Sequence, residues 1–167
     1  MPRPQPEFVP VSSAAPAAAP ALMTSSPGTL AWTLGLAGLI PFLLAASFQW
    51  FTPPGWRMLA ASALLGYGAV IASFLGGIHW GLAMRTGTPP AARLIWGVMP
   101  SLLGWLAVLL EGPWGQLLLA LSLLACWLVD RSVYRDLGLA AWLPLRTLLS
   151  AVAIASVLLG ALAYWIA

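Results

Sequence analysis

The chain has 167 residues, of which 61% are apolar and only 7% charged, and its mean hydropathy is +0.93. Soluble domains carry about 25% charged residues, so this composition excludes an ordinary soluble domain. The net charge of +3 comes from arginine without lysine, and it indicates orientation in a membrane rather than a nucleic-acid partner. The single cysteine, Cys126, excludes an intrachain disulfide and a multi-cysteine metal site.

The first 28 residues are rich in proline, alanine and serine and show no apolar periodicity. Such a segment buries too little apolar surface to offset its ordering entropy, so we predict that residues 1–28 form a disordered tail. It does not resemble a signal peptide, because its small residues precede the apolar region instead of following it. Met23, shortly before the first apolar stretch, is an alternative start of the protein.

Five apolar stretches follow, separated by segments that contain proline, glycine or charged residues. At about 1.5 Å per helical residue, they have the lengths needed to cross a hydrocarbon core of about 30 Å, the third and fourth with little tilt. We therefore predict an all-α integral membrane protein, a bundle of about five transmembrane helices, with a polar loop between the fourth and the fifth. The predicted spans cover residues 29–51, 58–84, 94–110, 114–129 and 145–167.

Arginine is unevenly distributed between the two sides of the predicted bundle. Six of the seven arginines lie on the side of the N-terminus, and only Arg57 lies on the other side. Cytoplasmic segments of membrane proteins carry an excess of basic residues, so we predict a cytoplasmic N-terminus and an external C-terminus. The ten tryptophans fall near the two predicted interfaces, which favours the same arrangement. The expected location is the bacterial inner membrane, with the C-terminus in the periplasm.

The second stretch, residues 58–84, contains no charged residue and holds the only histidine, His79. Wound as a helix, it has one bulky face and one face of small residues. Because small residues let backbones approach closely in a membrane, we predict that the small face packs against neighbouring helices and the bulky face contacts lipid. The predicted helix-packing residues are Ser73, Gly76, Gly77 and Gly81. The bulky face comprises Leu64, Tyr67, Ile71, Phe74, Leu75, Ile78 and Leu82.

His79 lies at the edge of the small face, about 9 Å along the helix from Arg85 and the inner charged belt. Polar groups at this depth are costly and often functional. The functional alternatives are a haem ligand, a hydrogen-bond partner of a quinone and a proton-relay group. The structural alternative is a neutral histidine that joins two helices by a hydrogen bond. One histidine cannot supply a two-histidine haem site, so a second ligand would come from Met84, Met99 or another subunit.

Pro41 and Pro100 lie within the first and third spans, where each removes a helical hydrogen bond, and we predict kinks at both. Such kinks either shape a bundle or line a substrate cavity. The charges that follow the fourth span sum to zero, and we expect them to pair with one another at the surface, with Arg146 as a further partner. These charged residues are Asp130, Arg131, Arg135 and Asp136.

The sequence contains no recognisable catalytic motif. It contains no nucleophile paired with a base, no metal-ligand cluster and no phosphate-binding loop, so we expect no catalytic site, no metal site and no enzymatic activity. The first hypothesis is an accessory or scaffolding protein that packs against other membrane proteins, or against itself, through the small face. The alternative is a small-ligand membrane protein that uses His79, either a haem or quinone binder or a compact transporter. The lipid bilayer is an expected partner, whereas nucleic acid is not.

Several segments resemble one membrane-protein family. They are YGAVIASFLGGIHWGLAM (67–84), LGLAGLIPF (34–42), WGVMPSLLGWL from Trp96, and the Asp130-Arg131 pair followed by Trp142 and Arg146. The family is bacterial and mitochondrial and is called domain of unknown function 3429; its eukaryotic members are similar to transmembrane protein 69. The resemblance covers about residues 30–165 and implies an inner-membrane protein of about five helices. It implies no activity, because the family has none assigned.

Overall fold

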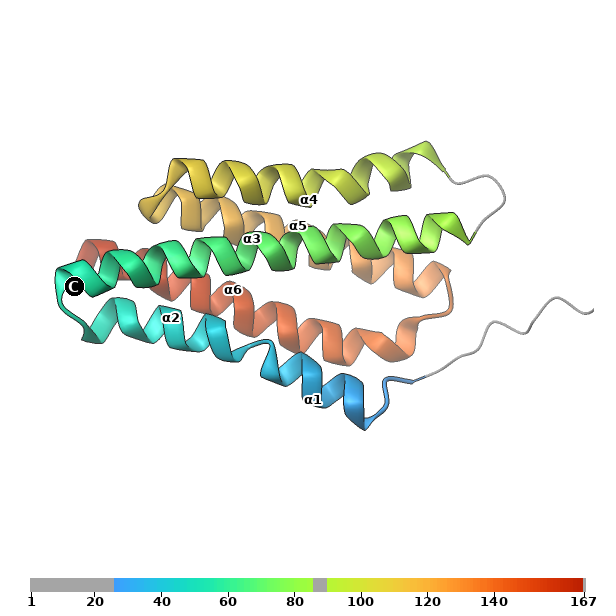
Figure 1. Cartoon of the computed structure of the whole chain (residues 1–167). Coiled ribbons are helices and arrows are strands. Elements are labelled where there is room, and N and C mark those ends of the chain that lie inside the picture. The colour runs from blue at the N-terminus through green and yellow to red at the C-terminus, as the bar shows by residue number, and fades with distance from the viewer. Residues whose placement is uncertain (1–25, 86–89, 167) are drawn as a thin grey trace, which may run out of the picture.

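The structure of the chain, a computed structural model, describes residues 26–85 and 90–166. These residues form helices that lie side by side along the length of the molecule, and they contain no strand (Figure 1). The helices are α1 (Thr29–Ala37), α2 (Ile40–Phe51), α3 (Pro54–Met84), α4 (Ala91–Leu110), α5 (Gly112–Asp136), the short 3-10 helix η1 (Ala140–Trp142) and α6 (Leu143–Ile166).

Five helical stretches are long and apolar enough to cross a membrane, which confirms the predicted all-α membrane bundle. The first crossing combines α1 and α2, and the last combines η1 and α6. The start of α1 and the C-terminal end of α6 lie at opposite ends of the bundle, as an odd number of crossings requires (Figure 1). Met23 and all but the last three residues of the predicted tail lie outside the described residues.

The fourth crossing is longer than predicted. Residues 130–136 were expected in a polar loop, but α5 continues through them to Asp136. Arg135, in the last turn, is favourably placed there because a helix carries partial negative charge at its C-terminal end. Asp130, the first charged residue after the apolar stretch, therefore does not end this helix, because its charge is paired with Arg146 inside the bundle.

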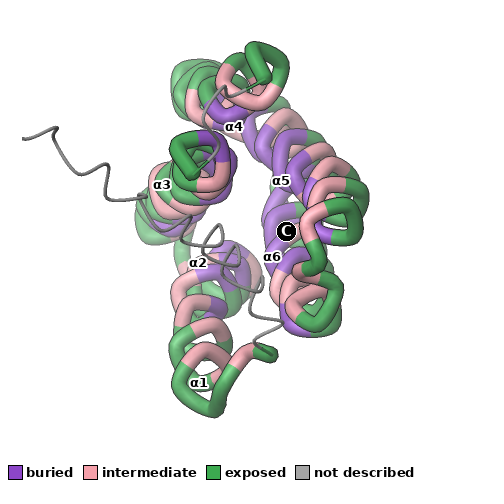
Figure 2. The backbone as a smooth tube through the Cα atoms, turned by 90° about the vertical axis from the view of Figure 1, so that its right-hand side faces the viewer, coloured by how far each residue is buried: buried purple, intermediate pink, exposed green. Residues whose placement is uncertain are grey.

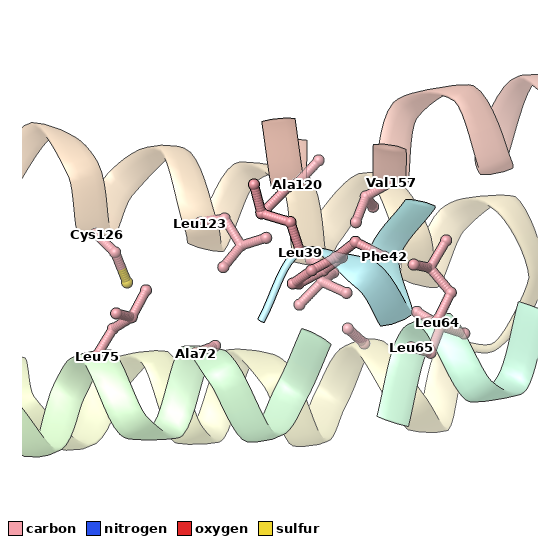
Figure 3. Packing of buried hydrophobic residues seen from close by; sticks show 13 residues of the cluster. Leu39, Phe42, Leu64, Leu65, Ala72, Leu75, Ala120, Leu123, Cys126 and Val157 are labelled. Atoms are coloured by element: carbon pink, nitrogen blue, oxygen red, sulfur yellow. The ribbon is translucent and has the colours of Figure 1, made fainter. Parts of the chain in front are cut away.

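The core lies between α3, α5 and α6 and includes the start of α2. Figure 2 shows the buried parts of these helices turned toward the middle of the bundle. In the close-up of Figure 3, side chains from the facing helices fill the space between them, with Cys126 among them as a small apolar group. The apolar core includes Leu39, Phe42, Leu64, Leu65, Ala72, Leu75, Leu119, Leu123, Cys126 and Val157.

The buried face of α3 is rotated from the predicted one. Gly77 and Gly81 are exposed, with no described atom within 4 Å of a side chain placed there, and Ser73 is exposed as well. In contrast, Leu64 and Leu75, predicted to contact lipid, are buried in the core. The prediction that Ser73, Gly77 and Gly81 pack against helices of this chain is therefore wrong. The inward face consists of Ala61, Leu64, Leu65, Gly68, Ala72, Leu75, Gly76, His79 and Ala83.

Only Gly76 of the predicted packing set lies at a helix crossing. A side chain at Gly76 would collide with the carbonyl oxygen of Gly97 on α4. The two backbones can approach this closely because both residues lack a side chain. Lipid tails are as apolar as leucine, so the pattern of bulky and small residues did not reveal which face turns inward.

The two prolines differ in their effects. The helix breaks between α1 and α2 at Gly38 and Leu39, and Pro41 lies in the first turn of α2. The hydroxyl of Tyr67 on α3 donates a hydrogen bond of 2.8 Å to the Gly38 carbonyl at this break. Pro100 is buried inside α4, which runs through it without interruption. The first crossing is thus divided into two helices, whereas the third is one.

Candidate functional site

Three polar side chains from three helices meet near the end of the bundle where α3 and α5 end and α6 begins. Nε2 of His79 lies 2.8 Å from Oδ1 of Asp130. On the other side of the same carboxylate, Nε of Arg146 donates to Oδ2 at 2.7 Å, and Nη2 of Arg146 also lies within ion-pair distance of Oδ2. The side chains of His79 and Asp130 are 2% and 1% exposed. We call His79, Asp130 and Arg146 the buried cluster.

Helical periodicity places these side chains inside the bundle. On α5, Asp130 continues a buried row formed by Leu119, Leu123 and Cys126, spaced by three and four residues. On α3, His79 belongs to the same inward face as Gly76. A carboxylate removed from water is very costly unless it is paired and hydrogen-bonded. The histidine and the arginine provide both, so the cluster can remain buried.

The sequence predicted part of this arrangement. Asp130 does pair with Arg146, but Asp130 is buried and Arg146 is partly buried, so the expected surface network is wrong in this respect. Arg131 lies over the ring of Trp127 at 5.6 Å, and Arg135 is exposed. The contact between His79 and Asp130 was missed. The one sequence signal for it is the row of buried positions on α5 that ends at Asp130.

The geometry of His79 bears on the predicted ligand roles. With the proton on Nε2, His79 donates to Asp130, and its ring lies edge-on to Trp96 at a centroid distance of 6.5 Å. An iron atom at Nε2 would have to displace Asp130, so this arrangement disfavours haem ligation through that atom. Within residues 26–85 and 90–166, no three histidine, cysteine, aspartate or glutamate side chains gather as a metal site would require.

A cavity of about 600 Å³ lies beside the buried cluster, between α1, α2, α3, α5 and α6. Its walls are mostly apolar, and its principal polar side chains are Arg146, Ser150 and Tyr134. Leu34 on α1 and Phe74 on α3 line it and are 63% and 65% exposed, so the cavity opens at the outer surface between these helices. Asp130 does not line the cavity but lies behind Arg146.

The break in the first crossing creates this opening. At Gly38 the chain changes direction, so α1 lies against α6 and away from α3 (Figures 1 and 2). Gly35 allows the contact with α6, because a side chain there would lie 2.9 Å from Cδ1 of Leu149. Tyr67 holds the break in place from α3 through its hydrogen bond to Gly38. One wall of the cavity is therefore a short helix that is separated from α2 by the break at Gly38.

A second buried polar contact lies toward the other end of the bundle. Nε2 of Gln116 on α5 donates to Oε1 of Gln49 on α2 at 2.8 Å, and both side chains are fully buried. Gly160 of α6 lies against the pair, where a side chain would come within 3 Å of both amides. This contact joins helices and is not adjacent to the cavity described above. No pattern in the sequence indicates that these two glutamines meet.

Comparison with known proteins places the described helices within one family. A profile of the family described as "Protein of unknown function (DUF3429)" matches residues 27–162, a range that includes the whole buried cluster. "Transmembrane protein 69" of Xenopus tropicalis is 43% identical over 81 residues. The aligned part covers 46% of this chain and 31% of that protein, so the chain spans less than a third of the length of this relative. No solved structure matches the chain.

Proposed function

This chain belongs to the DUF3429 family, whose description assigns no function, and we propose that it is a multi-pass membrane protein that binds a small lipid-soluble ligand. The observation that carries this proposal is the cavity of about 600 Å³ with Arg146 at its polar side. Ligand sites are typically cavities of roughly 300–1,000 Å³, mostly apolar, with a few placed polar groups. The cavity has this character, and it opens where lipid surrounds the protein.

In this proposal the buried cluster has a positioning role. Asp130 holds the guanidinium of Arg146 by two contacts, and His79 holds Asp130 from the far side. His79 itself does not line the cavity, so it acts through its neighbours. This favours a ligand recognised by hydrogen bonds over a haem bound through the histidine.

Filling the cavity tests this function. Ile71 and Val70 are neighbours on α3, but only Ile71 lines the cavity, whereas Val70 is 64% exposed. We expect the wild-type protein and Val70→Phe to co-purify in mild detergent with a defined lipid-soluble molecule, detected by organic extraction and mass spectrometry. Ile71→Phe should retain several-fold less of it at similar thermal stability. Equal retention by the two variants, or no bound molecule in wild-type protein, contradicts the proposal.

A second function, as an accessory or scaffolding protein, is favoured by the exposed small residues of α3. Gly77 and Gly81 have open space where a side chain would lie, which suits close approach of a helix from another protein or a second copy. Crosslinking in mild detergent with mass spectrometry should then yield a defined partner or homo-oligomer, lost in Gly81→Leu and kept in the exposed control Val70→Leu. A monomer without a partner in the wild-type protein argues against this role.

We further propose a non-enzymatic protein of the bacterial inner membrane with a cytoplasmic N-terminus. The arginine distribution supports the orientation. Arg57 lies at the start of α3, whereas five arginines lie at the other end of the bundle, where α3 and α5 end and α4 and α6 begin. Membrane proteins retain such basic residues on the cytoplasmic side. These five are Arg85, Arg93, Arg131, Arg135 and Arg146.

A further inference from the structure

We infer that the ligand of this cavity has an uncharged, carbonyl-bearing head, as a quinone does, and that Arg146, Ser150 and Tyr134 bind this head by hydrogen bonds. The inference rests on the proposed ligand-binding function and specifies the class of ligand. Three properties of the site lead to it, namely its net charge, its unused hydrogen-bond donors and the position of its opening.

The net charge of the site favours a neutral head. Asp130 and Arg146 form an ion pair inside the bundle, so together they carry no net charge. A cationic head would find no free carboxylate, because His79 and Arg146 occupy both oxygens of Asp130. An anionic head would be drawn to Arg146 but would lie close to the carboxylate directly behind it. Moving an unpaired ion out of water is energetically unfavourable, whereas an uncharged head avoids this cost.

The unused donors favour an acceptor oxygen. A guanidinium has five N–H groups and no acceptor, and only those on the Asp130 side are used by the carboxylate. Nη1 is 3.5 Å from Oγ of Ser150, a long contact that leaves its N–H groups available, whereas Nη2 is enclosed against Oδ2 of Asp130. The hydroxyls of Ser150 and Tyr134 add donors at the same wall. A carbonyl oxygen has two lone pairs to accept these bonds.

The position of the opening favours a ligand with an apolar tail. Phe74 at the rim lies ten residues before Met84, the last residue of α3, hence about 15 Å along the helix from that end. The opening therefore lies within the hydrocarbon core of a membrane about 30 Å thick. A ligand can enter sideways from the bilayer, place its head at Arg146 and leave its tail among the apolar side chains near the rim.

Matched probes test the head chemistry on the purified full-length protein. We would measure the Kd values of decyl-benzoquinone, decylbenzene, decyltrimethylammonium and decanoate, which share an apolar chain and differ in the head. We expect decyl-benzoquinone to bind at least about tenfold more tightly than decylbenzene, since it gains more than one hydrogen bond. Decyltrimethylammonium and decanoate should bind more weakly than decyl-benzoquinone.

Two serines of α6 provide the matched variants. Ser150 lines the cavity beside Arg146, whereas Ser156 is similarly buried, bonds to the Val152 carbonyl and lies outside the cavity. Ser150→Ala should weaken decyl-benzoquinone binding about fivefold and leave decylbenzene unchanged, and Ser156→Ala should change neither. Tyr134→Phe should act like Ser150→Ala. Thermal unfolding of each variant verifies that the fold is retained.

The outcomes separate this inference from the function on which it rests. If decylbenzene binds as tightly as decyl-benzoquinone, the cavity binds apolar molecules but the inferred head is wrong. Tighter binding of the ammonium or of decanoate would likewise overturn the neutral carbonyl head. If Ser150→Ala and Tyr134→Phe both leave the head preference unchanged, the assigned donors are wrong. If none of the probes binds, the proposed ligand-binding function fails together with the inference.

Discussion

At the scale of single residues, Gly76 and Gly77 are neighbours in the sequence but have opposite surroundings. A methyl group at Gly76 would collide with the Gly97 carbonyl on α4, whereas Gly77 faces open space among the described residues. We expect Gly76→Ala to lower the free energy of unfolding by about 1–3 kcal/mol, because neither backbone can move aside without disturbing the crossing. Gly77→Ala should leave stability unchanged or raise it by up to about 1 kcal/mol, since alanine favours helix more than glycine does.

Unfolding of both glycine variants in detergent, followed by circular dichroism, measures this difference. Gly66→Ala, at another position without close neighbours, serves as a second control. A stable Gly76→Ala beside an unfolded Gly77→Ala would mean that the opposite face of α3 packs against the bundle.

A second prediction at this scale concerns the hydrogen bond between His79 and Asp130 and its contribution to stability. His79→Gln keeps an N–H group that can reach the carboxylate, so it should cost at most about 1 kcal/mol, near the average for hydrogen bonds between membrane helices. His79→Leu leaves Oδ1 of Asp130 buried without its partner and should cost about 1–3 kcal/mol. Thermal unfolding distinguishes the two variants, and equal losses would show that the hydrogen bond does not support the fold.

At the scale of helices, the ion pair between Asp130 and Arg146 joins α5 to α6. Arg146→Met leaves the buried Asp130 without its cationic partner and should cost about 3–5 kcal/mol. Asp130→Leu leaves the partly buried Arg146 unpaired and should cost less. The double variant should be more stable than either single variant, because no unpaired charge remains. Arg135→Met, at an exposed position of α5, is the matched control and should change stability by less than about 0.5 kcal/mol.

A double-variant cycle of unfolding free energies measures this coupling. Simple additivity of the two single losses would mean that the side chains do not interact across the helices. The same cycle with His79→Leu in place of Arg146→Met measures the coupling free energy between His79 on α3 and Asp130 on α5.

The break between α1 and α2 predicts where the bundle is most easily opened. Tyr67→Phe removes the hydrogen bond to the Gly38 carbonyl but keeps the edge-on ring contact with Phe42, whose centroid is 5.1 Å away. We expect a loss of about 1 kcal/mol, expressed mainly as faster amide hydrogen exchange in α1 and at the break. Unchanged exchange there, or faster exchange spread evenly over α5 and α6, would contradict a hinge at Gly38.

At the scale of the whole molecule, the odd number of crossings determines the relation between the two ends of the chain. With the proposed cytoplasmic N-terminus, a reporter fused after Ala167 should be active as alkaline phosphatase and dark as green fluorescent protein. A fusion in the segment between α3 and α4 should give the opposite result, because Arg85 in that segment and Arg93 in the first turn of α4 would lie on the cytoplasmic side. A C-terminal fusion that fluoresces as green fluorescent protein would contradict the proposed orientation.

The sequence alone determined that this is a helical membrane protein, with five crossings within residues 26–85 and 90–166. The reason is local: each crossing needs an uninterrupted apolar stretch of about twenty residues, and such stretches can be counted without knowing their neighbours. The family resemblance was likewise visible in short segments such as the one around His79, and the match over residues 27–162 confirms it. The end of the fourth helix was missed, because the charge of Asp130 suggested a loop.

Which side of each helix faces inward depends on how the whole bundle packs. The small residues around Gly77 and Gly81 predict a contact surface, but the core forms on the face of Ala72 and Gly76. In water an apolar face has to turn inward, but in a membrane lipid covers it equally well, so periodicity does not give the direction. Asp130 meets partners 51 and 16 residues away in the sequence, and this meeting depends on how α3, α5 and α6 pack together.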